Sequence, residues 1–156
     1  MTMIYLAARY TRRLELCGYR DQLEALGYEV PARWLNGMHQ LDNDGKPIGE
    51  DGEALVEQHD EHGSAQASPP LREKFALDDY RDVLAADVLV AFTEVPRSGN
   101  SRGGRHVELG IALGSGIPVM IVGPRENVFC HLPHVRHFED WAGCLDALTR
   151  SRARLA

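Results

Sequence analysis

The chain has 156 residues, three cysteines, and 17 lysines and arginines against 23 aspartates and glutamates. This length fits one domain, which would bury about two-thirds of the surface of the unfolded chain. The mildly acidic balance disfavours a nucleic-acid polymer as partner. The cysteine count does not suggest a disulfide framework and no leader is recognisable, so we expect a cytoplasmic protein. Apolar runs fall far short of the roughly 20 residues of a membrane span, so no membrane association is expected.

The first part of the chain predicts a strand, a helix, a second strand and an irregular insertion. The apolar run at 3–8 predicts a strand, and leucines at helical spacing after Thr11 predict a helix. Residues 28–34 predict a second strand. Pro31 indicates that this strand lies near an edge of the sheet or that it ends early. Residues 36–70 then lose hydrophobic periodicity and contain many glycine and proline turn signals, so we expect a loop-rich insertion there.

The remainder of the chain alternates helix and strand. Five elements are predicted, in the order helix, strand, helix, strand, helix: 71–84, 87–93, 104–115, 117–123 and 141–150. This alternation predicts an α/β fold, a single Rossmann-like (flavodoxin-like) domain over 1–156 with a parallel five-stranded sheet and helices on both faces. In such folds, ligands bind at the carboxyl ends of the strands.

The segment 101–114 places one carboxylate directly behind a loop rich in glycine and arginine. Glu108 stands among apolar residues of the predicted helix, where a carboxylate is costly unless it is paired or reactive. Glycine backbone and a helix N-terminus together favour an anion. We therefore predict a substrate-binding loop made by five residues: Ser101, Arg102, Gly103, Gly104 and Arg105. The alternatives are an exposed Glu108 on a polar helix face and a flexible surface loop.

A group of aspartates supplies candidate partners for Glu108. Asp87 stands at the entrance of a predicted strand, and Asp79 lies two helical turns before it. At least one of them can face the same crevice as Glu108, and two carboxyl groups in different surroundings can act as nucleophile and proton donor. Asp87 is also a candidate substrate-binding residue. We interpret Asp78 and Asp82 as a solvated helix face.

The histidines do not predict a metal centre. Five of them have spacings that resemble metal ligands: His59, His62, His131, His134 and His137. Pro133 breaks any regular helix through the last three, and the first two lie in the insertion. We therefore expect structural or surface roles for them, and a wall or capping role for His106. The chain has no P-loop and no dinucleotide fingerprint, and we expect it to need no metal and no organic cofactor.

Four pieces of the chain resemble the nucleoside 2-deoxyribosyltransferase family, which includes deoxynucleoside 5′-monophosphate N-glycosidases. They are the first strand with Tyr5, the acidic Asp79 ahead of the strand at 87–93, the Glu-Leu-Gly of 108–110, and the segment 127–135. Together they span nearly the whole chain apart from the insertion. The resemblance implies that Glu108 is a nucleophile, that Tyr5 positions it and that Asp79 assists the leaving base. It also implies that Asn127 reaches into the site of a neighbouring subunit, in a homodimer or higher homo-oligomer with shared sites.

The resemblance implies cleavage of the N-glycosidic bond of a (2′-deoxy)nucleoside or a nucleoside 5′-monophosphate. A glycosyl intermediate on Glu108 would then pass to water or to a second base. The loop 95–105 is longer and more basic than in the plain nucleoside transferases, which favours an anionic substrate, and the family's C-terminal substrate-binding tail is not evident at 151–156. Three residues at the start of the insertion are candidates to contact the base: Trp34, Met38 and His39.

Two other functions remain open, and a third is disfavoured. A non-catalytic nucleotide-binding or sensing module would use Glu108 to bind a ribose hydroxyl. A metal-dependent enzyme would use the histidines. A phosphoribohydrolase of the lysine-decarboxylase-like group is disfavoured, because Arg102-Gly-Gly-Arg105 lacks the Pro-Gly-Gly-x-Gly-Thr loop of that group.

Overall fold

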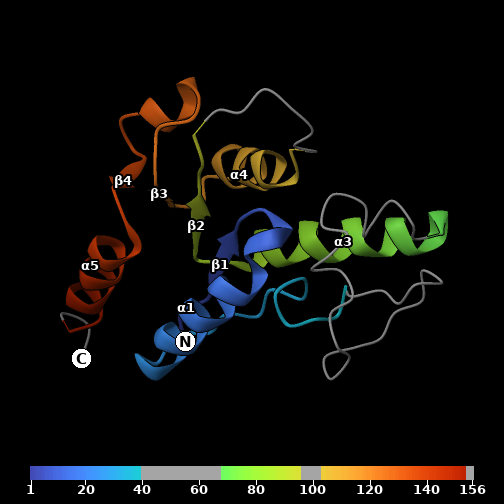
Figure 1. The fold of residues 1–156 in the computed structure, drawn as a ribbon, viewed down its shortest axis with the longest axis horizontal. Helices are drawn as coiled ribbons and strands as arrows, with labels where there is room; N and C mark the ends of the chain where they lie inside the picture. The colour runs from blue at the N-terminus through green and yellow to red at the C-terminus, as the bar shows by residue number, and fades with distance from the viewer. Residues whose placement is uncertain (40–67, 96–102, 154–156) are drawn as a thin grey trace.

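A single parallel sheet forms the centre of the molecule. The structure is a computed structural model and describes residues 1–39, 68–95 and 103–153. Within them the sheet has four strands in the order β1-β2-β3-β4: Ile4–Ala7, Val88–Phe92, Val119–Val122 and Arg136–Phe138 (Figure 1). Tyr5 pairs with Leu89, and Leu89 with Val119. Parallel neighbours require crossover connections, and the intervening helices supply them. The predicted α/β class with a parallel sheet is confirmed.

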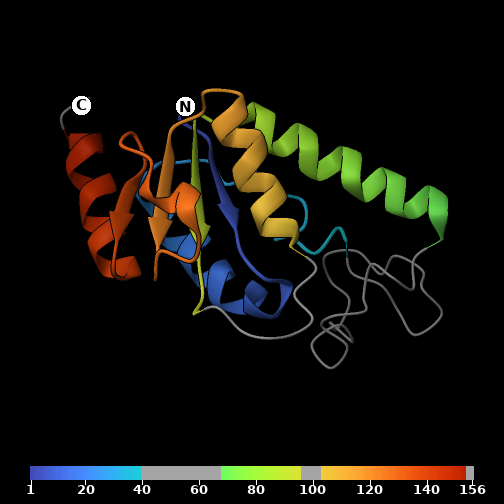
Figure 2. The ribbon, with the colours of Figure 1, turned by 90° about the horizontal axis from the view of Figure 1, so that it is seen from above.

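Helices cover both faces of this sheet. They are α1, α3, α4 and α5, with two short 3-10 helices, η1 and η3: Arg13–Ala25, Pro69–Ala85, Gly104–Gly114, Trp141–Ala153, Tyr10–Arg12 and Val128–His131. The helices α3 and α4 lie side by side on one face, and α1 and α5 lie on the other (Figures 1 and 2). On the second face Phe92 contacts Tyr19 of α1 and Trp141 of α5, with ring centroids 5.4 and 5.7 Å apart.

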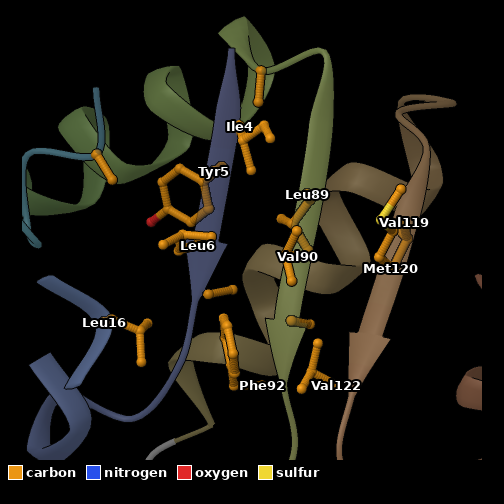
Figure 3. Packing of buried hydrophobic residues seen from close by; sticks show 14 of the residues in the cluster. Ile4, Tyr5, Leu6, Leu16, Leu89, Val90, Phe92, Val119, Met120 and Val122 are labelled. Atoms are coloured by element: carbon orange, nitrogen blue, oxygen red, sulfur yellow. The ribbon is translucent and has the colours of Figure 1, made fainter. Parts of the chain in front are cut away.

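The strands are buried on both faces, which explains their continuous apolar sequence. Each residue of β1 is at most 1% exposed, and Val90 and Leu89 of β2 are fully buried. Figure 3 shows these side chains packed with those of β3 and with Leu16 of α1. Because successive residues of a strand point to opposite faces, the packing fixes the face to which each side chain turns. Tyr5 is thereby directed to the face that carries α4.

The predicted strand at 28–34 is wrong, and the described sheet has four strands instead of five. Glu29 forms a single parallel bridge to Met3, the residue directly before β1. Pro31 has no N–H to donate to a ladder, and the chain then turns, with the amides of Leu35 and Asn36 both donating to Ala32 O at 3.1 Å. The strand β4 was not predicted, since the three residues of β4 include only one strongly apolar side chain.

The predicted helices are present, with shifted ends. The helix α3 begins two residues earlier than predicted because Pro69 and Pro70 occupy its first turn, where a fixed φ is favourable. The helix α5 extends three residues further than predicted. Most of the predicted insertion, residues 40–67, lies outside the described residues. In the described part of the chain, no helix combines the length and the apolar character needed to span a membrane.

Candidate active site

The site is built around Glu108, in the second turn of α4. The helix begins after Gly103, whose φ of +74° suits glycine, and the amides of His106 and Val107 donate to Gly103 O. One turn later, the Glu108 side chain meets Tyr5 of β1, whose hydroxyl donates to Oε1 at 2.7 Å. The predicted contact between these two residues, separated by 103 positions, is therefore present.

Burial decides the ionisation of this pair. Tyr5 is 1% exposed, and burial together with the nearby Glu108 charge holds the pKa of its phenol well above the ordinary value. Tyr5 therefore remains a hydrogen-bond donor. Burial also raises the pKa of Glu108 to about 7, against the opposing effect of the Tyr5 hydrogen bond. Glu108 thus titrates near neutral pH, and the alternative of a solvated glutamate on a polar helix face is wrong.

Asp79 of α3 supplies the second carboxyl group. Burial first, and then the charge of Glu108, raise its pKa to about 8. Its side chain is 32% exposed, while its Oδ1 atom is buried and lies 3.6 Å from Nδ1 of His39. At neutral pH Asp79 is therefore mainly protonated and able to donate a proton. Of the two candidate partners for Glu108, Asp79 is the one whose pKa the charge of Glu108 raises.

Asp78 and Asp82 are buried, and their predicted role as a solvated helix face is wrong. Arg33 donates to Asp78 Oδ1 at 2.6 Å and to Asp82 Oδ1 at 3.0 Å, and its backbone N–H donates to Asp82 Oδ2. Lys74 adds a second cation on Asp78, at 2.6 Å. The two aspartates are one turn apart on the face of α3 that meets residues 31–39, so a single planar guanidinium can bind both.

Arg105, predicted to bind an anion, forms an internal ion pair. Its side chain is 5% exposed and forms an ion pair with Glu126, in the loop after β3. Glu126 also accepts a hydrogen bond from the backbone N–H of Glu94, after β2, at 3.3 Å, and lies 3.4 Å from His106 Nε2. The arginine therefore joins the start of α4 to the ends of two strands. The ion pair turns the guanidinium inward, and binding of a substrate anion by Arg105 stays a prediction.

Two other candidate residues have structural contacts of their own. Asp87 precedes β2 at the amino end of the sheet, where its carboxylate accepts a hydrogen bond from the backbone N–H of Met3 at 2.8 Å. This end is opposite to the predicted crevice, so Asp87 is not brought to Glu108, and its substrate-binding role stays a prediction. Asn127 caps η3 by accepting from the Phe129 N–H at 2.9 Å. Its predicted role in a neighbouring subunit stays a prediction.

The remaining predicted binding residues fall into two groups. Gly103 and Gly104 form the start of α4, one turn before Glu108. Ser101 and Arg102 lie outside the described residues. Contact of these four residues with a substrate stays a prediction.

The residues near the start of the insertion differ in their contacts. Trp34 is buried and donates through Nε1 to Leu6 O, whereas Met38 is 41% exposed. His39 contacts the two aspartates Asp78 and Asp79. Sequence reasoning proposed His39 only as a base contact, and its place beside the acid follows from the turn after Pro31.

The histidines of the last third of the chain are not gathered at one point. His137 Nε2 donates a hydrogen bond to Gly123 O at 2.7 Å. Within residues 1–39, 68–95 and 103–153, no three His, Cys, Asp or Glu side chains are arranged to hold a metal ion. The spaced pair His59 and His62 lies outside these ranges.

The comparisons with known proteins agree on the fold. No protein-family profile and no curated protein sequence matches the chain. Among solved structures, a 2-deoxyribosyltransferase from Bacillus psychrosaccharolyticus is 20% identical with a TM-score of 0.62, over 95% of this chain and 96% of that chain. A CMP N-glycosidase from Clostridium botulinum is 17% identical with a TM-score of 0.51, over 94% and 98% of the two chains. At these identities the likeness establishes a shared fold, which is that of the proteins the sequence resembles.

Proposed function

We propose that this protein cleaves the N-glycosidic bond of a (2′-deoxy)nucleoside or a nucleoside 5′-monophosphate. The observation that carries the proposal is the position of Glu108, which accepts a hydrogen bond from the Tyr5 hydroxyl at 2.7 Å, near a second carboxyl group, Asp79, whose pKa is raised by burial and by the charge of Glu108. Such a pair provides a nucleophile and a proton donor at the same pH. The two structural neighbours are a 2-deoxyribosyltransferase and a CMP N-glycosidase, and their activities suggest the N-glycosidic bond and the class of substrate.

The reaction has two steps. The carboxylate of Glu108 attacks the anomeric carbon, the bond from this carbon to the base nitrogen breaks, and Asp79 gives its proton to the departing base. The product is an ester between the sugar and Glu108. Asp79, now a carboxylate, takes a proton from water as the water attacks the anomeric carbon, which frees Glu108. A second base in place of water would complete a transfer. Tyr5 holds Glu108 in position through its hydrogen bond.

Replacement of the nucleophile tests the proposal. A panel of nucleosides and their monophosphates is incubated with the protein, and released base is measured by chromatography. We expect Glu108→Gln and Glu108→Ala to lower base release at least about 1,000-fold, because no ester can form. Glu73→Gln, an exposed glutamate of α3, is the matched control and should retain full activity. Base release that survives in Glu108→Gln would exclude Glu108 as the nucleophile.

The alternative of a nucleotide-binding module predicts a different result. Wild-type protein would then bind a nucleotide tightly in calorimetry and release no base from any member of the panel. In that case Glu108→Gln would weaken binding, since the carboxylate would bind a ribose hydroxyl. Product analysis of the same panel identifies the acceptor, because free sugar indicates hydrolysis and a new nucleoside indicates transfer.

We also propose that the protein self-associates through the surface around Asn127. The neighbouring side chains Val128 and Phe129 are 77% and 60% exposed, which is unusual for large apolar groups next to each other. A second subunit covering them would bring Asn127 near another site. Light scattering of wild type and Phe129→Asp measures this, and a wild-type monomer at all concentrations would remove Asn127 from the site.

A further inference from the structure

His39 contacts the candidate acid on a side that the proposed reaction does not use. Its side chain is 7% exposed, its ring lies over Phe75 with centroids 4.3 Å apart, and its Nδ1 is 3.6 Å from Asp79 Oδ1. Among the described residues, Asp79 Oδ1 has no hydrogen-bond partner, although the atom is buried. Buried polar atoms are almost always satisfied in folded proteins. A closure of a few tenths of an ångström would turn the Nδ1 to Oδ1 contact into a hydrogen bond.

The two oxygens of Asp79 differ in their surroundings. Oδ1 is buried toward His39, while the side chain as a whole is 32% exposed. The accessible oxygen is therefore Oδ2. A carboxylic acid gives its proton from the oxygen that carries it, so Asp79 can protonate a base in the site only when the proton is on Oδ2.

We propose that His39 is a positioning residue for Asp79, whose Nδ1–H donates to Oδ1 and thereby keeps the acid proton on Oδ2, toward the departing base. The proton moves from Oδ2 to the base nitrogen, and the imidazole keeps its own proton throughout. The same hydrogen bond stabilises the carboxylate that remains on Asp79. This inference rests on the proposed function, because it concerns the acid of the same reaction.

The neighbours of His39 favour this tautomer. Nε2 faces Asp78 Oδ2 at 3.7 Å, but that oxygen already accepts from Lys74 at 2.6 Å, and Arg33 binds the other oxygen. Lys74 and Arg33 thus neutralise the charge of Asp78 without the imidazole, so the single N–H of a neutral ring is available to Nδ1. Burial lowers the pKa of His39 to about 4, so the ring is neutral at the pH values where the two carboxyl groups titrate.

Charged and titratable groups from every neighbouring element surround the pair. They come from α3, the segment 31–39, α4 and β1: Lys74, Asp78, Asp82, Arg33, Glu108 and Tyr5. None of these side chains is changed in the variants below, so an effect on Asp79 reports on His39.

Three substitutions separate the two nitrogens of the ring. The amide N–H of His39→Asn lies close to the position of Nδ1, that of His39→Gln lies close to Nε2, and His39→Leu has no donor. The carboxyl carbon of Asp79 is followed by NMR from pH 5 to pH 10. A lost donor disfavours the ionised form, so we expect the pKa of Asp79 to rise by about 1 unit in the Gln and Leu variants and to stay near wild type in the Asn variant. This titration needs no turnover, so it tests the His39 contact separately from the reaction.

Steady-state kinetics then test the consequence for catalysis. We expect kcat to fall roughly 10- to 100-fold in His39→Gln and His39→Leu with little change in KM, and His39→Asn to restore most of it. A 7-methylated purine nucleoside, whose base carries a positive charge and leaves without a proton, should show almost no loss. A purely structural role would slow both substrates alike.

The results of these experiments distinguish the role of His39 from the proposed reaction. Equal Asp79 titrations in all variants, or equal turnover by the Asn and Gln variants, would overturn the role of His39. If Glu108→Gln is inactive in the same assays, only this inference falls. If Glu108→Gln remains active, the proposed reaction falls with its nucleophile, while the titration still decides the contact between His39 and Asp79.

Discussion

Glu108 and Asp79 have raised pKa values for the same leading reason, which is loss of solvation through partial burial. Asp79 is raised further because Glu108, Asp82 and Asp78 add negative charge around it. Both carboxyl groups therefore titrate near neutral pH, and Asp79 keeps its proton to a higher pH than Glu108. This is the combination that attack and base protonation require.

The pH dependence of the reaction follows from these two groups. Activity requires the ionised form of Glu108 and the protonated form of Asp79, so kcat/KM should rise through about pH 7 and fall above about pH 8. Asp79→Asn should remove the alkaline limb and lower turnover about 100-fold, because the base leaves without a proton. A pH profile measured from pH 5 to pH 10 checks both statements. An alkaline limb that persists in Asp79→Asn would assign it to another group.

The burial of Arg105 predicts a loss of stability upon its removal. Arg105→Ala removes the arginine partner of Glu126, whose side chain is only 12% exposed, which should cost about 3 kcal/mol in the free energy of unfolding. Urea denaturation followed by circular dichroism measures this. Arg102→Ala is the contrasting variant: we expect it to leave stability unchanged and to lower turnover of monophosphates more than that of nucleosides. Equal effects of the two variants on stability would contradict this division.

At the scale of elements, the segment 31–39 and α3 are joined by charge as well as by apolar packing. Arg33 binds both Asp78 and Asp82, and the same contact brings His39 over Phe75 and beside Asp79. Asp79, the candidate acid, thus lies between Asp78 and Asp82, two buried residues of the same helix. Turns and a single bridge replace the predicted second strand, and this irregular path is what delivers His39 to the site.

Removal of Arg33 should loosen this junction. In Arg33→Ala two buried aspartates lose their shared cation, and we expect the free energy of unfolding to fall by about 3 to 4 kcal/mol. Arg33→Lys should recover only part of the loss, because an ammonium group cannot bind two carboxylates through a planar fork. Thermal and urea denaturation give the values. Arg81→Ala, an exposed position on the same helix, is the control and should change stability by less than about 0.5 kcal/mol.

At the scale of the whole molecule, the buried carboxyl groups connect the site to folding stability. The pKa of Glu108 is about 7 in the folded protein against 4.5 in an unfolded chain, so the folded state binds the proton more strongly. Stability is therefore greatest below about pH 4.5 with respect to this group and is lost as the pH rises through about pH 7. The ionised Glu108 that the proposed reaction requires therefore lowers the free energy of unfolding.

Neutralising Glu108 should reverse that loss. We expect Glu108→Gln to be more stable than wild type at pH 8, by on the order of 2 kcal/mol, and nearly equal to it at pH 5, where the wild-type carboxyl is protonated. Melting temperatures at the two pH values measure the difference. A variant that is equally stabilised at both would show that packing, and not ionisation, sets the cost.

The sequence by itself determined the α/β class, four helices and three of the four strands, because apolar periodicity is a local signal. The contact of Tyr5 with Glu108 was implied by the family resemblance and not by periodicity, since 103 positions separate the two residues. The tertiary structure decided what depends on partners far along the chain. Arg33 finds Asp82 across 49 positions, and Arg105 finds Glu126 across 21, so residues that look solvated or anion-binding in the sequence become internal ion pairs. Burial also set the pKa values of Glu108 and Asp79, since desolvation depends on what covers a side chain and not on its neighbours in sequence.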